Sequence, residues 1–222
     1  MTDNGFRGTP VVGGEDIADR IEPRPVLESH VLHEGYVFDL VSETADLGEA
    51  GEVRREFLRH PGAVAIVALD AEDRVVLIQQ YRHPVRALDW EIPAGLLDVE
   101  GEDPAVAASR ELLEEADLRA ERWDVLIDYW TTPGGNDEAI RIYLARDLSD
   151  VPEDERHDRE GEELGMPTAW VSLDEAHAAV LAGRLHNPSA CLGILAAHAS
   201  RAGGWSSLRP VDSPWPEHPA HR

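Results

Sequence analysis

The chain has 222 residues, which is enough for one well-buried core of ordinary domain size with a small appended subdomain. Its 44 acidic residues outnumber its 20 basic ones, and the net charge is −24. Because such a charge repels a phosphate backbone, the composition argues against nucleic-acid binding. No apolar stretch approaches the roughly 18 residues of a membrane span, and no secretion signal is recognised. We therefore expect a cytoplasmic protein with no membrane or nucleic-acid partner.

The N-terminal part is predicted to contain two regions. Residues 1–24 are rich in glycine, proline and charge without periodicity, which predicts a flexible arm. Residues 25–60 contain short segments with partial alternation of apolar and polar residues, and this pattern predicts a small antiparallel β-sheet. The sheet has too few apolar residues to be buried alone, so we expect it to pack on the main domain or on a second copy of the chain.

Two short apolar runs come next, at 63–69 and 75–81, on either side of the turn-forming residues 70–73. This arrangement predicts a buried hairpin. A further short strand is expected around 90–95, where the sequence ends in proline and glycine.

A helix is predicted to follow, because Asp103 precedes Pro104. Aspartate is a favoured N-cap residue, and proline is favoured at the first helical position. The helix should end near Ala116, with Asp117 in the left-handed closing position that glycine usually takes.

The rest of the chain alternates between strands and helices. We predict strands at 123–130, 139–145 and 168–171, an exposed acidic loop at 150–163, and helices at 172–183 and 189–201. This interleaving predicts an α/β fold with a mixed sheet covered by helices, in a main domain at 61–201. Residues 202–222 contain four prolines and two tryptophans and are expected to form a tail along the surface.

The helix at 104–116 carries three carboxylates within five residues, Glu111, Glu114 and Glu115. Successive helical residues turn by about 100°, so Glu111 and Glu115 share one face and Glu114 lies beside them. Like charges in one small volume repel each other, and a hard cation such as Mg²⁺ relieves that repulsion. Arg110 is placed to orient Glu114. Taken alone, the run is also consistent with a solvated acidic helix face.

Together with Glu102, this run resembles the Nudix box, G-x5-E-x7-R-E-U-x-E-E-x-G-U, where U is aliphatic. The spacing from Glu102 onward matches. Gly95 lies one residue too far upstream, and Asp117 stands where the box has its closing glycine. Both departures fall at loop positions and leave the carboxylates in place. The resemblance covers roughly residues 60–200 and implies a Nudix α/β/α sandwich with a mixed central sheet.

The resemblance also implies a metal site. Glu111 and Glu115 would be the principal ligands, Glu114 would assist, and the carbonyl of Ala94 would complete the site. The implied cofactor is Mg²⁺, with Mn²⁺ as the alternative. Members of the family hydrolyse nucleoside diphosphates linked to another group, because bound divalent ions neutralise the diphosphate and lower the pKa of the attacking water.

The loop at 133–138, Pro-Gly-Gly-Asn-Asp-Glu, begins sixteen residues beyond Asp117. It resembles the Pro-Gly-x-x-Asp-Glu loop of the ADP-ribose pyrophosphatase branch, particularly its actinobacterial members, although a simple turn is the alternative for such a loop alone. This likeness implies Mg²⁺-dependent hydrolysis of ADP-ribose to AMP and ribose 5-phosphate by a homodimer. The alternatives are another nucleoside diphosphate derivative, such as a nucleotide sugar or an oxidised nucleotide, and a non-catalytic nucleotide sensor.

Catalysis also needs a general base near the metal but outside the helix. Relatives place it in the loop before the next-to-last strand, and the spacing to Trp170 favours Glu163 over Glu162. Glu115 is the third catalytic candidate, through its bound metal.

Substrate contacts are also carried over from the resemblance: Arg55, Arg82, Phe38 and Glu138. A dianionic substrate needs local cations in so acidic a protein. Arg55 would reach the site of a dimer partner, and the neighbouring Arg54 is its rival. Phe38 or Tyr36 would stack on adenine, with core packing as the alternative. In this branch the N-terminal sheet, here 25–60, is exchanged or packed between two subunits.

Overall fold

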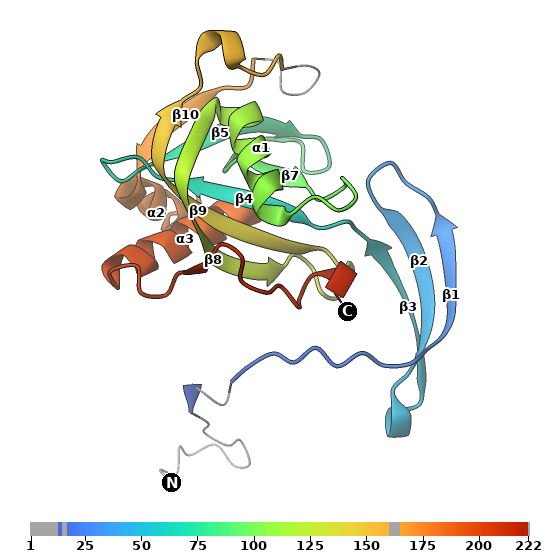
Figure 1. Ribbon diagram of the computed structural model, residues 1–222. Coiled ribbons are helices and arrows are strands. Elements are labelled where there is room, and N and C mark those ends of the chain that lie inside the picture. The colour runs from blue at the N-terminus through green and yellow to red at the C-terminus, as the bar shows by residue number, and fades with distance from the viewer. Residues whose placement is uncertain (1–12, 15–16, 160–164, 222) are drawn as a thin grey trace.

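The computed structural model describes residues 13–14, 17–159 and 165–221. Its N-terminal part contains the predicted antiparallel sheet, formed by β1 (Val26–His33), β2 (Asp39–Asp46) and β3 (Glu52–Arg59). Figure 1 shows this sheet standing apart from the body of the molecule. Every residue of β1 is exposed, so neither of its faces is covered by the rest of the chain that the structure describes.

The body contains two further sheets. The larger has the order β11 (Arg209–Pro210), β8 (Leu118–Trp130), β9 (Ala139–Asp150), β4 (Ala63–Ala68) and β7 (Ala94–Leu96). The smaller has the order β10 (Thr168–Ser172), β5 (Arg74–Arg82) and β6 (Ala87–Glu91). Since β4 and β9 run parallel while their other neighbours are antiparallel, the larger sheet is mixed.

Three helices cover the sheets: α1 (Pro104–Ala116), α2 (Leu173–Leu181) and α3 (Pro188–Ala202). Successive side chains of β4 point to opposite faces, so Val64 and Ile66 pack with α1 while Ala65 and Val67 pack with α3. Figure 1 shows α1 apart from the α2–α3 pair. The α/β/α arrangement predicted from the sequence is confirmed. None of the described helices is both long and apolar enough to span a membrane.

Side-chain caps fix the helix ends where the sequence predicts them. The Oδ1 of Asp103 accepts the N–H of Ala105 at 2.8 Å, and α1 begins at the next residue, a proline. Asp117 closes α1 in the left-handed region, with φ 54° and ψ 37°. Asn187 caps α3 by accepting the N–H of Ala190 at 3.0 Å.

The predicted hairpin of 63–69 and 75–81 is wrong. A turn at 70–73 does join the two runs, and Leu69 pairs with Val75, but β4 lies in the larger sheet and β5 in the smaller one. β4 pairs with β9 and β7, and β5 pairs with β10 and β6. Runs that are apolar on both faces predict burial but do not select a partner strand.

The acidic segment predicted as an exposed loop at 150–163 is confirmed over most of its described part, because residues 152–158 are exposed and contain only a short 3-10 turn. The two strands before it are longer than predicted, since β8 begins at Leu118 and β9 continues to Asp150, and the next residue, Val151, is 1% exposed. A short 3-10 turn follows at Glu153–Glu155.

The tail packs more tightly than a surface tail would. Trp215 is 4% exposed, and the guanidinium of Arg141 lies 4.8 Å from the centre of its ring. Arg141 also donates to the carbonyls of Ser213 and Pro214, at 2.7 and 3.1 Å. Because Arg141 pairs with Asp128 through two hydrogen bonds of 2.7 and 3.0 Å, the tail is fastened to both β8 and β9.

We predict that Asp128→Ala lowers the free energy of unfolding by about 3 kcal/mol, because it leaves the buried charge of Arg141 without its carboxylate. Urea denaturation measures the change. The control is Glu72→Gln, which breaks an exposed ion pair with Arg74 and should cost less than about 1 kcal/mol. Equal losses in the two variants would mean that the buried pair does not hold the tail.

Candidate active site

The last turns of α1 carry the three predicted carboxylates, and two of them, Glu111 and Glu115, contact β7. Glu111 and Glu115 are 9% and 7% exposed, and the side chain of Glu114 is 25% exposed. The Oε2 of Glu115 accepts the N–H of Ala94 at 2.8 Å. Two residues of the predicted metal site, 21 apart in sequence, are therefore in direct contact, through the N–H of Ala94 and not through the carbonyl that is the predicted ligand.

Gly95 lies against the same helix. A Cβ at this position would overlap the carboxyl group of Glu111, so only glycine permits the approach. Gly95 pairs with Val64 in the sheet, and its φ is not in the left-handed region. The glycine that stands one residue too far upstream in the box is thus placed by its contact with a carboxylate.

Arg110 gathers the acidic side chains around one guanidinium. Its Nη1 donates to Glu111 at 2.6 Å and to Glu114 at 3.1 Å, and its Nε and Nη2 donate to Glu102 at 3.1 and 3.0 Å. Hydrogen bonding to Arg110 lowers the pKa of Glu102, and hydrogen bonding to Glu102 raises the pKa of Arg110. Glu102 therefore stays ionised beside Arg110 at neutral pH.

The donor set suits a hard divalent cation. Carboxylate oxygens and a backbone carbonyl are the ligands that Mg²⁺ prefers, and Mg²⁺ usually fills its remaining positions with water and substrate phosphates. Among the described residues, no three His, Cys, Asp or Glu side chains form a ready-made metal cluster. In this structure Arg110 already supplies a positive charge between Glu111 and Glu114. Glu111, Glu114, Glu115 and the carbonyl of Ala94 remain the predicted ligands.

Arg82 forms an ion pair that was not predicted from the sequence. Its Nε and Nη2 donate to the two carboxylate oxygens of Glu91, at 2.6 and 2.7 Å. Glu91 is 3% exposed at the end of β6, three residues before Ala94, and Arg82 is about half exposed. The pair crosses two antiparallel strands, so no local sequence signal announces it. A substrate contact by Arg82 stays a prediction, and it would have to be shared with Glu91.

Arg55, in β3 of the N-terminal sheet, lies close to residues 133–137 of the Pro-Gly loop. They line a cavity of about 490 Å³, together with Glu43 and Trp130. The sheet is joined to this loop because Leu58 exchanges two backbone hydrogen bonds with it, to the carbonyl of Gly135 at 3.0 Å and from the N–H of Asp137 at 3.1 Å. Arg55 therefore lies beside the Pro-Gly loop of its own chain, a proximity that the sequence did not predict, and its contact with the site of a dimer partner stays a prediction.

Glu138 closes that loop from inside. It accepts a hydrogen bond from Thr131 at 2.7 Å and lies 3.5 Å from Nδ1 of His60. Its side chain is 18% exposed. The position fits a residue that shapes the loop, and a direct substrate contact stays a prediction.

The other predicted residues are not brought to this cavity in the described chain. Phe38 is 45% exposed and Tyr36 is fully exposed, so neither packs in a core. Neither side chain is among those that line the cavity at Arg55. Glu162 and Glu163 lie outside the described residues.

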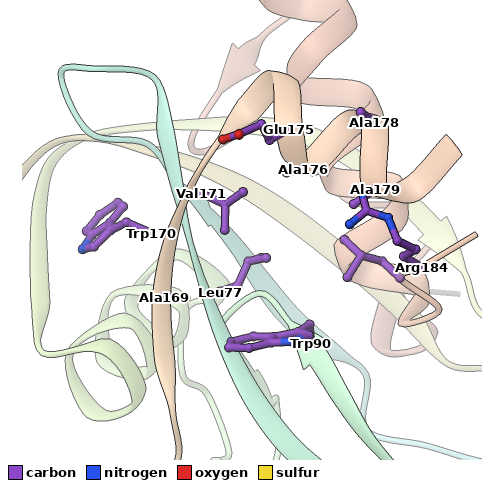
Figure 2. A pocket seen from close by; sticks show the side chains of 11 residues that line it. Leu77, Trp90, Ala169, Trp170, Val171, Glu175, Ala176, Ala178, Ala179 and Arg184 are labelled. Carbon is purple, nitrogen blue, oxygen red and sulfur yellow. The ribbon is translucent and has the colours of Figure 1, made fainter. Parts of the chain in front are cut away.

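A second cavity, of about 670 Å³, lies between the smaller sheet and α2. Figure 2 shows Leu77, Val171 and Trp90 on one side of it and Arg184 on the other. None of the described candidate residues lines it. This cavity is therefore not where the predicted chemistry is gathered.

Comparison with known proteins relates this geometry to a family. Residues 59–190 match the NUDIX domain family. The chain is 42% identical over 193 residues to the ADP-ribose pyrophosphatase of Mycobacterium tuberculosis, covering 87% of this chain and 91% of that protein. It is 34% identical over 156 residues to the ADP-ribose pyrophosphatase of Bacillus subtilis, covering 70% of this chain and 82% of the relative.

A solved structure has the same fold. The crystal structure of an ADP compounds hydrolase superimposes with a TM-score of 0.66 at 21% sequence identity, covering 84% of this chain and 98% of the other. At this identity the likeness bears on the fold alone.

We predict that Gly95→Ala displaces the carboxylate of Glu111 and weakens Mn²⁺ binding about tenfold or more, because the added methyl group takes the space of that carboxylate. Titration with Mn²⁺ followed by its electron paramagnetic resonance signal measures the affinity. The matched control is Gly14→Ala, where an added Cβ meets no atom. Unchanged Mn²⁺ affinity in a folded Gly95→Ala protein would refute the contact as part of a metal site.

Proposed function

Because the chain belongs to the NUDIX domain family, we propose that it is a Mg²⁺-dependent hydrolase that cleaves the diphosphate of ADP-ribose to AMP and ribose 5-phosphate. The observation that carries the proposal is the pair of contacts between Glu115 and Ala94 and between Glu111 and Gly95, which places three of the predicted metal ligands close together. The substrate assignment is supported by the near full-length likeness to two ADP-ribose pyrophosphatases.

The charged residues near the end of α1 have distinct roles in this proposal. Glu111 and Glu115 are held against β7 and would bind the cation together with the carbonyl of Ala94, while Glu114 assists. Arg110 limits the repulsion between Glu111 and Glu114, with which it forms ion pairs. A bound Mg²⁺ would neutralise the diphosphate and lower the pKa of the attacking water. Mn²⁺ would bind the same oxygen ligands.

Substrate recognition is proposed for the loop side of the site. Arg55 and Arg82 would contact the anionic substrate, Glu138 would hold the loop at 131–138 in shape, and Phe38 would stack on adenine. The need for such cations follows from the net charge of −24, which otherwise repels a dianion. Glu163 is proposed as the general base, with Glu162 as its rival.

A homodimer would complete this arrangement. β1 exposes apolar side chains that a monomer leaves in water: Val26, Leu27, Val31 and Leu32. Burying these side chains against a second copy would be favourable, and it would bring Phe38 next to a partner subunit's surface. The cytoplasmic location expected from the sequence stays a prediction.

Incubation with Mg²⁺ and a panel of substrates tests the activity. The panel contains ADP-ribose, a nucleotide sugar and an oxidised nucleoside triphosphate, and the products are separated by ion-exchange chromatography. AMP and ribose 5-phosphate formed fastest from ADP-ribose is the expected result. Faster cleavage of another compound would replace the substrate, and tight binding of intact ADP-ribose would instead identify a sensor.

We predict that Glu115→Gln lowers kcat for ADP-ribose on the order of 100-fold or more, because it removes one negative charge from an electrostatic site while keeping the side-chain shape. The amide oxygen still accepts the N–H of Ala94, so the melting temperature should change little. Glu100→Gln, an exposed carboxylate near the box, is the charge-matched control. Turnover close to wild type in Glu115→Gln would disprove the metal assignment.

A further inference from the structure

Asp117 occupies a position where an L-residue other than glycine is strained. It closes α1 with φ 54° and ψ 37°, a region that disfavours a side chain with a Cβ. The Nudix box has glycine at this position, so this chain departs from it at a backbone cost. Aspartate tolerates the left-handed region better than most residues, and its carboxylate adds contacts that glycine lacks.

Those contacts join α1 to the connection between β9 and β10. The Oδ2 of Asp117 accepts a hydrogen bond from Nη2 of Arg159 at 2.7 Å, and its backbone carbonyl accepts the N–H of Val151 at 2.9 Å. The Nε of Arg159 donates to the carbonyl of Glu114 at 2.9 Å. One guanidinium therefore binds both the side chain that ends the helix and a carbonyl of its last turn.

The ion pair between Arg159 and Asp117 is partly buried, so water screens it less than a surface pair. The side chains of Arg159 and Asp117 are 22% and 20% exposed. The other carboxylate oxygen of Asp117 is buried and has no hydrogen-bond partner among the described residues, so Arg159 is the group that compensates its charge. The positive guanidinium also lies at the negative end of the helix dipole, where it is favourable.

We propose that Arg159 and Asp117 form a clasp that positions Glu114 and Glu115 for cation binding, and that Arg159 is a positioning residue for the reaction. Glu114 is held through its own carbonyl, and Glu115 lies between the two groups that Arg159 binds. If the clasp opens, the last turn of α1 frays and the two carboxylates lose their fixed direction. The proposal rests on the proposed metal-dependent hydrolysis, and it assigns a role to a residue pair that the box does not contain.

Arg159→Ala tests the clasp. We expect Mn²⁺ affinity, measured on the folded protein without substrate, to fall about tenfold, as for other residues that orient metal ligands. We also expect kcat for ADP-ribose at fixed Mg²⁺ to fall similarly, with KM changed less than twofold, and raised Mg²⁺ to restore part of the loss. Glu155→Gln is the control, because it breaks the exposed ion pair of Arg119 in the same connection without touching the helix end.

Asp117→Gly separates positioning from stability. Glycine relieves the backbone strain but removes the carboxylate, so Mn²⁺ affinity should fall while the melting temperature falls less than in Arg159→Ala. In the Asp117→Gly background, Arg159→Ala should have a smaller effect on Mn²⁺ affinity than in the wild type, because the pair is already broken.

The outcomes distinguish the clasp from the proposed substrate. Weaker Mn²⁺ binding in Arg159→Ala supports the clasp even if the wild type cleaves a compound other than ADP-ribose. A lower melting temperature with Mn²⁺ affinity and kcat within twofold of wild type would reduce the clasp to a structural contact. Wild-type protein that binds no Mn²⁺ would overturn both the clasp and the metal-dependent function.

Discussion

Electrostatic repulsion within one helical turn is the constraint on which this structure is built. Glu111, Glu114 and Glu115 concentrate three negative charges in a chain that already carries an excess of 24. Hydrogen-bond donors at fixed positions reduce this repulsion. The guanidinium of Arg110 donates to Glu111 and Glu114, and the N–H of Ala94 donates to Glu115. The residual excess of negative charge is what a divalent cation would neutralise, so the same feature that strains the turn makes it selective for cations.

The features of this site that depend only on neighbouring residues could be predicted from the sequence. Asp103, Pro104 and Asp117 bound α1 because capping depends on the nearest few residues, and the spacing of the glutamates follows from the helical turn. The close approach of Gly95 to Glu111 depends on how β7 docks on α1, and nothing within a few residues of Gly95 determines that.

The features that the sequence did not predict also depend on contacts between separate elements. The runs at 63–69 and 75–81 enter different sheets because β4 pairs with β9, more than seventy residues away in sequence. The ion pair of Glu91 could not be predicted because its partner, Arg82, lies on the neighbouring strand. Arg159 binds a residue 42 positions earlier, which no local pattern could indicate. In each case the determining contact joins elements that only the folded chain brings together.

The carboxylate turn also depends on residues at the far end of the chain. β7 is aligned on β4, and the N–H of Leu97 bonds to the carbonyl of Gly62 at 3.1 Å, just before β4 begins. Gly62 has φ 87° and lies against the ring of His218, whose Nε2 is 2.9 Å from the carbonyl of Pro61.

That histidine is held in turn by the packed tail. His218 lies 4.7 Å from the ring of Trp215, which the buried Arg141 covers. The carbonyl of Glu217 accepts a hydrogen bond from Trp130 at 3.1 Å, beside the loop that lines the cavity at Arg55. The tail therefore contacts both the residues just before β4 and the end of β8. In this way it connects the strands behind the predicted metal ligands to the loop proposed to bind substrate. A tail with this many fixed contacts belongs to the scaffold of the site, although its proline-rich composition is typical of a loose extension.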